Sequence, residues 1–121
     1  MKRRSDPRHL KRVAIMQDLF SWQFKGEKKS ASGIKLIIAH LPQIDKLIEK
    51  AAPDRPLSEI NRIDLAILRL SVFELIIDKG VPPKVVIDEA VELGKEYGAD
   101  SSAGFINGAL GKVIEIKKIQ T

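Results

Sequence analysis

The stretch from Asn61 to Asp78 constrains the fold of this 121-residue chain more than any other part of the sequence. At the 100° per residue of an α-helix, it places its apolar side chains in two stripes instead of one. The stripes consist of Ile63, Ala66, Leu70, Phe73 and Ile77, and of Leu65, Leu68, Val72, Leu75 and Ile76. A surface helix needs only one apolar face, so we expect this helix to be enclosed on both sides. It is predicted to be the central helix of a small bundle, with Asn61 as its N-cap.

The remaining helices are predicted from the same helical periodicity. They span residues 7–25, 34–50, 83–97 and, after Asp100 and Ser101, 102 to about 118. Asp6 and Pro7 form a favourable start for the first helix, and Pro42 should kink or split the second near His40. No stretch shows the alternating pattern or the hairpin turns of a sheet. The sequence therefore predicts an all-α fold, a compact single-domain helical bundle with about five principal helices.

The first helix carries both apolar and basic residues, and its orientation has to be inferred from them. Its apolar spacing predicts an inward face that consists of Leu10, Val13, Ala14, Met16, Phe20 and Phe24. The outer face is then expected to carry three cations and a short strip beyond them, namely Arg8, Lys11 and Arg12, followed by Ile15, Leu19 and Trp22. Aromatic rings beside cations can stack on the bases of single-stranded RNA. Trp22 is more often packed on a neighbouring helix, and we favour packing for it.

Basic residues are concentrated at the N-terminus. Six of the first twelve residues are basic and one is acidic, which gives this segment a net charge of +5. The rest of the chain carries 15 basic and 15 acidic residues, so the whole net charge of +5 lies in the first tenth of the sequence. Such a leader can bind phosphates or an anionic membrane face, and a solubilising tail is the simpler alternative. We expect residues 1–6 to form a flexible basic arm and residues 7–121 to form the helical domain.

The composition argues against several classes of protein. With 44% hydrophobic and 31% charged residues, the chain is of the globular type. No apolar run approaches the roughly 20 residues of a membrane span, so we expect a cytoplasmic protein without a membrane partner. The absence of cysteine excludes disulfides and thiolate metal sites. His9 and His40 lack the spacing of metal ligands or catalytic pairs, so we expect no metal, no cofactor and no enzymatic activity.

Three glycines in the predicted last helix are unusual. Gly104, Gly108 and Gly111 project away from its apolar face. Each exposed helical glycine costs about 1 kcal/mol relative to alanine. Either a ligand or partner backbone comes very close there, or the helix tolerates them through fraying or close packing on a second helix. The sequence leaves these two interpretations equally open.

Four sequence blocks follow one another in a recognisable order. They are RRSDPRHLKRVAIMQDLFSW, IDLAILRLSVFEL, PPKVVIDEAVELGKEYG and SSAGFINGAL. These blocks resemble the NusB family of bacterial transcription antitermination factors. The first is similar to the family's arginine-rich start and Q-A-L-Y-x-W-like run, and the second to its A-I-L-R-x-x-x-x-E-L core. The third and fourth are similar to its P-x-K-V-x-I-N-E-A-V-E-L-A-K-x-F-G and S-x-x-F-V-N-G-x-L segments, whereas residues 25–58 are short and match weakly.

The resemblance implies an all-helical, RNA-binding factor in the transcription of ribosomal RNA. The family binds boxA, a short single-stranded RNA element of ribosomal RNA leader transcripts, as a heterodimer with the ribosomal protein NusE. That heterodimer joins other Nus factors on RNA polymerase and suppresses premature termination. By position, the implied RNA-binding residues are Lys2, Arg3, Arg4, Arg8, Lys11, Arg12, Phe20, Asp64, Ser101 and Phe105.

Two positions depart from the family pattern, and the partner surface is only weakly indicated. Phe20 stands where the family often has tyrosine, and Gly104 replaces its usual lysine. For the basic ribosomal partner, the acidic residues Glu74 and Asp78 are the predicted contact. Some members of the family self-associate, so a homodimer is compatible with the resemblance.

Two alternative functions remain open from the sequence. NusB-like domains also occur as RNA-binding modules of ribosomal RNA methyltransferases. A helical protein-interaction module without sequence-specific RNA binding would have the same bundle and the same basic leader. Preferential binding of boxA-like RNA would separate antitermination from both.

Overall fold

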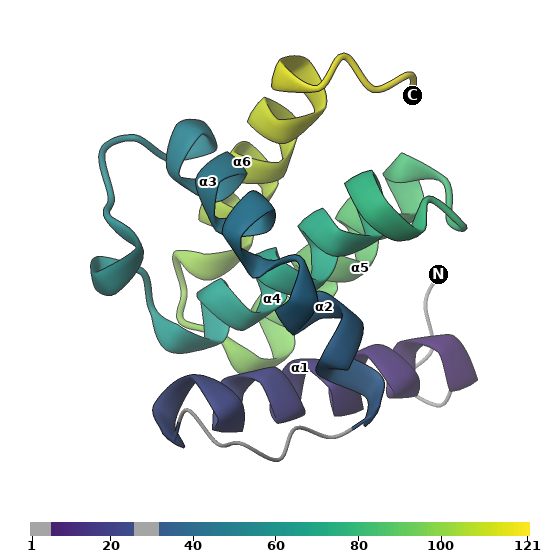
Figure 1. Ribbon diagram of the computed structural model, residues 1–121. Coiled ribbons are helices and arrows are strands. Elements are labelled where there is room, and N and C mark those ends of the chain that lie inside the picture. Colours follow the sequence, from purple (N-terminus) through teal and green to yellow (C-terminus); the bar gives the residue numbers. More distant parts are fainter. Residues whose placement is uncertain (1–5, 26–31) are drawn as a thin grey trace.

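The computed structural model describes residues 6–25 and 32–121, which form the helical bundle shown in Figure 1. Its helices are α1 (Pro7–Lys25), α2 (Lys35–Ala39), α3 (Leu41–Ala51), α4 (Arg62–Phe73), α5 (Pro83–Tyr97) and α6 (Ser102–Ile116). Short 3₁₀ turns occupy Ser32–Ile34 and Leu57–Glu59, and a π-helical turn, Glu74–Asp78, continues α4. These residues contain no strand. The predicted all-α fold is confirmed.

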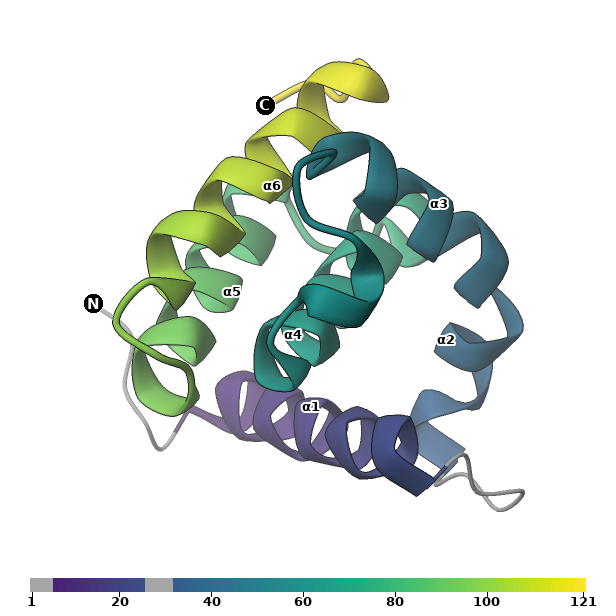
Figure 2. The same cartoon turned by 90° about the vertical axis from the view of Figure 1, so that its left-hand side faces the viewer.

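Helix α4 is the central element of the bundle. It contacts α1, α3, α5 and α6, and Figures 1 and 2 show it in the middle of the molecule. Both of its predicted apolar stripes are buried, for example through Ala66 in one and Leu68 in the other. At its start, Asn61 Oδ1 accepts hydrogen bonds from the backbone N–H groups of Ile63, at 2.8 Å, and Asp64, at 3.4 Å. The prediction of a capped central helix, enclosed on both sides, is therefore confirmed.

The predicted helix 34–50 is split at His40, as expected from Pro42. α2 ends at Ala39, and α3 begins at Leu41 with Pro42 in its first turn. Proline has no N–H to donate, so it fits the start of a helix better than its interior. Between the two helices, His40 Nδ1 donates to the carbonyl oxygen of Leu36 at 2.9 Å. His40 is thus an ordinary helix-end residue.

Helix α1 has the predicted bounds but a different orientation. Asp6 caps it by accepting a hydrogen bond from the N–H of Arg8 at 2.8 Å. Its buried residues are His9, Arg12, Met16 and Leu19. Three residues predicted to face inward are exposed, namely Ala14, Leu10 (by 51%) and Phe24 (by 57%). The prediction that Arg12 lies on the outer face is wrong. Apolar spacing could not reveal that carboxylates elsewhere in the chain would accept the polar side chains of this helix.

The other half-buried residues of α1 pack against the core. Val13, Ile15, Phe20 and Trp22 all contact it, so the packing interpretation of Trp22 is confirmed. Figure 2 shows α1 lying along one side of the bundle. Contacts of His9 with α5 and of Gln23 with Arg62 fix its two ends.

Helices α5 and α6 pack against each other along their lengths. α5 has its predicted bounds, but Glu89, which lies on its predicted polar face, is only 4% exposed. α6 ends at Ile116, two residues before the predicted end. A Cβ added at Gly104, Gly108 or Gly111 would meet nothing within 4 Å, so close packing within the described chain does not explain these glycines. None of the described helices is long and apolar enough to cross a membrane.

Candidate nucleic-acid interface

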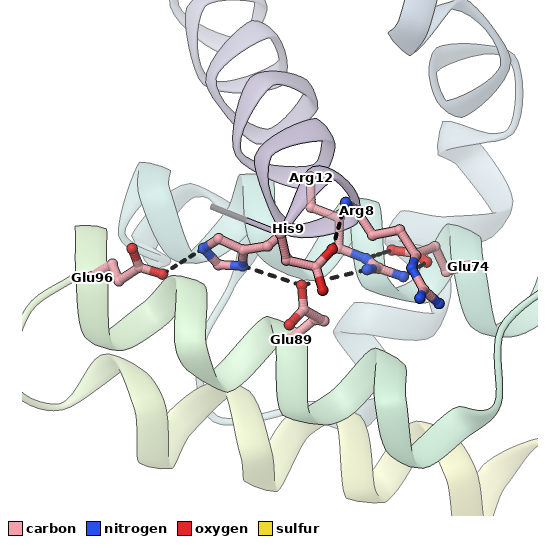
Figure 3. Close-up of polar contacts among 7 residues, drawn as sticks. Arg8, His9, Arg12, Glu74, Glu89 and Glu96 are labelled. Atoms are coloured by element: carbon pink, nitrogen blue, oxygen red, sulfur yellow. Dashed lines mark hydrogen bonds and ion pairs between the residues drawn. The ribbon is translucent and has the colours of Figure 1, made fainter. Parts of the chain in front are cut away.

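A buried ionic network joins the start of α1 to α5 and to the π-helical turn. Figure 3 shows His9 and Arg12 reaching from α1 to carboxylates on these elements. Arg12 Nη2 and Nε donate to the two carboxylate oxygens of Glu74 at 2.7 and 2.9 Å, and Nη1 lies 3.4 Å from Glu89 Oε1. His9 Nδ1 lies 3.2 Å from the same Glu89 oxygen, and Nε2 lies 2.7 Å from Glu96 Oε1.

This network engages two residues predicted to bind other molecules. Arg12 is 9% exposed and Glu74 is 7% exposed, and the two side chains form an ion pair with each other. The hydrogen bond to Glu74 raises the pKa of Arg12, with further attraction from Glu74 and Glu89, whereas burial acts in the opposite direction. Both side chains are largely buried and paired with each other in this arrangement. Their predicted roles in RNA and partner binding would require the network to open.

The exposed cations of α1 line a groove, which we call the α1–α2 groove. Its volume is about 460 Å³, and it is lined by Arg8, Lys11, Arg12, Ile15, Gly33, Leu36, Ile37, Leu70, Phe73, Glu74, Asp78 and Val81. Arg8 and Lys11 are exposed, as predicted. Leu36 is 59% exposed, and Asp78 is also exposed. The groove therefore combines an apolar surface with charges of both signs.

A second group of predicted residues lies where the start of α4 meets the start of α6. Asp64 is 2% exposed, and its Oδ1 has no hydrogen-bond partner among the described residues. Burial raises the pKa of Asp64, while a hydrogen bond from Ser102 and attraction to Arg55 partly oppose this effect. The guanidinium of Arg55 lies 4.1 Å from the centre of the Phe105 ring. Arg55 thus lies over the ring of Phe105 and close to the buried carboxylate of Asp64.

Phe20 belongs to neither group directly. Its ring packs edge-to-face on Phe24, with the ring centres 4.8 Å apart. The guanidinium of Arg62, the first residue of α4, lies 4.7 Å from the centre of the Phe24 ring. Phe20 is half-buried, so only part of its ring is open to a ligand.

The predicted site residues therefore separate into distinct places. Arg8, Lys11 and Asp78 line the α1–α2 groove, whereas Asp64 and Phe105 lie near Arg55. The exposed residue Ser101 immediately precedes α6. The three remaining cations, Lys2, Arg3 and Arg4, lie outside the described residues.

The sequence prediction missed Arg55 and Arg62. Both are basic residues next to the start of the central helix, and each lies over an aromatic ring. A basic residue beside a proline-rich break was the only local indication for Arg55. Among residues 6–25 and 32–121, no group of three histidine, aspartate or glutamate side chains is placed to hold a metal ion.

Comparisons with known proteins agree on one family. The family model described as NusB family matches residues 32–115. The transcription antitermination protein NusB of Roseiflexus castenholzii is 49% identical over 77 residues, which cover 62% of this chain and 54% of that protein. The chain thus spans about half the length of this curated relative.

Solved structures match over a larger share of the chain. The T. maritima NusB structure has a TM-score of 0.80 and 29% identity, covering 95% of this chain and 93% of that one. A second chain comes from a crystal structure of the antitermination factors NusB and NusE in complex with dsRNA, with a TM-score of 0.75. It is 24% identical and covers 92% of this chain and 99% of that one, so it shows likeness of fold.

Proposed function

Because this chain belongs to the NusB family, we propose that it is an RNA-binding transcription antitermination factor that acts together with a NusE-like ribosomal protein. Its RNA would be a boxA-like single strand of ribosomal RNA leader transcripts, bound within an antitermination complex on RNA polymerase. The observation that carries the proposal is the family match over residues 32–115, together with the 49% identical relative named as an antitermination protein. A protein of the same fold, crystallised with NusE and RNA, supports the choice of partners.

The two groups of site residues supply complementary chemistry for RNA. Arg8 and Lys11 are exposed and can neutralise phosphates, which gives affinity without reading bases. Lys2, Arg3 and Arg4 would add to this contact. Near the start of α6, Asp64 is 2% exposed, so its unpartnered Oδ1 would accept a hydrogen bond from a base once the side chains over it move. We therefore propose phosphate binding at the start of α1 and base recognition near Asp64, with Ser101, Phe105 and Phe20 as further contacts.

The α1–α2 groove is the proposed surface for the ribosomal partner. It presents the exposed apolar side chain of Leu36 beside the exposed carboxylate of Asp78. An apolar contact with a charged rim is the usual composition of a protein interface. Glu74, the other predicted contact, is bound to Arg12, so Asp78 is the acid that a basic partner would meet first.

We propose that it works by binding rather than by catalysis, as the description of its relative as an antitermination protein supports. A factor of RNA polymerase would act in the cytoplasm. Residues 1–6 would serve as a basic arm of the helical domain formed by residues 7–121.

A binding titration tests the proposed function. Labelled boxA-like RNA and a scrambled strand of equal length are titrated with the protein, with and without purified NusE. We expect tighter binding to the boxA-like strand, and a larger preference when NusE is present. Equal affinity for the two strands under both conditions would refute the proposal.

A pair of charge variants tests the phosphate contact. Arg8→Ala with Lys11→Ala removes two exposed cations, so the slope of log affinity against log salt should fall by up to about 1.4, or about 0.7 for each phosphate contact on a single strand. Lys46→Ala with Lys50→Ala, on the exposed side of α3, is the matched control. If both pairs change the slope equally, the α1 cations have no special role.

A further inference from the structure

A cleft separates the turn after α3 from the outer side of α6, and we call it the α3–α6 cleft. Its volume is about 450 Å³, and it is lined by Ala51, Ala52, Pro53, Asp54, Arg55, Gly104, Phe105, Gly108, Ala109 and Lys112. It shares no lining residue with the α1–α2 groove. Pockets of about 300–1,000 Å³ hold small ligands, so a single nucleotide fits this one.

Arg55 presents a flat, charged surface to this cleft. The side chain is exposed, yet its guanidinium rests on the ring of Phe105, 4.1 Å from the ring centre. Phe105 is half-buried and packs against the core, so it gives Arg55 a fixed support. Bases of single-stranded RNA stack on guanidinium planes as well as on aromatic rings. The arrangement leaves the outer side of Arg55 for such a base.

The α6 wall of the cleft includes two glycines, which expose the helix backbone. Gly104 and Gly108 line it, and a Cβ at either position would meet nothing within 4 Å. Packing within the described chain therefore does not require glycine at these positions, although glycine there lowers the stability of the helix. A strand that runs along α6 can approach the helix closely there.

The charges at the cleft suit a nucleotide. Arg55 and Lys112 are its basic lining residues, and Asp54 is its acidic one. The Lys112 side chain is 61% exposed, and its contact with Glu115 is long, at 3.8 Å. Lys112 can therefore turn to a phosphate, while the Asp54 carboxylate can accept a hydrogen bond from a ribose 2′-hydroxyl.

We propose that the α3–α6 cleft binds one nucleotide of the RNA strand, with its base stacked on Arg55 and its phosphate held by Lys112. This inference rests on the proposed function and extends it, because Arg55 and Lys112 are not among the residues that the sequence implicated. It also gives two of the three α6 glycines a role, since Gly104 and Gly108 keep the cleft open for the nucleotide.

A matched pair of glycine variants tests the cleft directly. Gly108→Leu fills the α3–α6 cleft, whereas Gly111→Leu adds the same side chain to α6 outside the cleft lining. Leucine favours helices, so both variants should melt at or above the wild-type temperature. We expect Gly108→Leu to weaken binding of the boxA-like RNA by at least about fivefold, the lower end for one stacked base. Gly111→Leu should bind like the wild type.

Two variants of Arg55 test the stacking itself. Arg55→Lys keeps the charge but loses the planar guanidinium, so it should lose most of the affinity that Arg55→Ala loses. Binding of RNAs shortened by one nucleotide at a time then locates the contact. Wild-type affinity should drop at one particular step, and Arg55→Ala and Gly108→Leu should abolish that drop.

The outcomes separate this inference from the proposed function. If the wild type prefers boxA-like RNA but Gly108→Leu binds as tightly as Gly111→Leu, the cleft holds no nucleotide and the function stands. If Arg55→Lys binds the boxA-like RNA as tightly as the wild type, the base does not stack on the guanidinium. If the wild type shows no preference for boxA-like RNA, the function and this inference fall together.

Discussion

Replacing Arg12 by alanine tests whether the buried ionic network holds α1 in place. Arg12 donates two hydrogen bonds to Glu74, at 2.7 and 2.9 Å, and both side chains are almost fully buried. Removing one partner of a buried ion pair costs about 3–5 kcal/mol, because the remaining charge is left without a counterion. Two hydrogen bonds to charged groups, at about 1.5–3 kcal/mol each, give a similar range. We therefore expect Arg12→Ala to lower the free energy of unfolding by about 4 kcal/mol.

Urea unfolding followed by circular dichroism measures this loss, with Arg8→Ala as the control on the same helix. Arg8 is exposed, so its replacement should change the free energy of unfolding by less than about 0.5 kcal/mol. Arg12→Met combined with Glu74→Met removes both charges and should recover most of the stability. A loss below about 1 kcal/mol for Arg12→Ala would refute the reasoning, because the network would then contribute no more than a surface contact.

Further predictions concern a helix cap, two glycines and a buried acid. Asn61→Ala removes the cap of α4 and should cost about 1 kcal/mol in urea unfolding; an unchanged midpoint would contradict the cap. Gly98→Ala would drive a Cβ into the Ser102 side chain and a backbone carbonyl, so a loss of about 1–3 kcal/mol is expected. Gly111→Ala meets open space and should instead gain up to about 1 kcal/mol; equal effects would contradict the geometry. Burial raises the pKa of Asp64, so its contribution to stability is largest below the unfolded pKa of about 3.9 and declines as pH rises through the folded pKa. Asp64→Asn should therefore gain stability relative to the wild type as pH rises above the unfolded pKa, and a difference independent of pH would contradict the shift.

Local rules were sufficient for most of the fold. The bounds of α1 and α5, the Asn61 cap and the split at Pro42 follow from residues within one turn of each boundary. The two-sided burial of α4 follows from helical periodicity alone. The π-helical turn Glu74–Asp78 did not, because its extra residue per turn leaves no distinct pattern in an apolar segment.

The candidate site was less accessible to sequence reasoning because its contacts join distant parts of the chain. Arg12 lies 62 residues from Glu74, and no periodicity relates them. Arg55 and Phe105 are likewise brought together only by the packing of α3 on α6. The family resemblance pointed to Asp64 and Phe105, and both residues lie near Arg55 in the structure. Their roles toward RNA stay predictions.

The buried network also explains how α1 presents its remaining cations. Arg8 and Lys11 immediately precede His9 and Arg12, and successive helical residues are turned by about 100° from each other. Fixing His9 and Arg12 against the carboxylates of α5 and the π-helical turn therefore forces Arg8 and Lys11 away from the core, where both are exposed. One arginine of the basic leader, Arg12, is thus buried, and its contacts set the orientation of the exposed cations Arg8 and Lys11. If Arg8 and Lys11 bind RNA phosphates as proposed, a variant that opens the network but stays folded should accordingly lose the salt dependence expected from them, although both residues are still present.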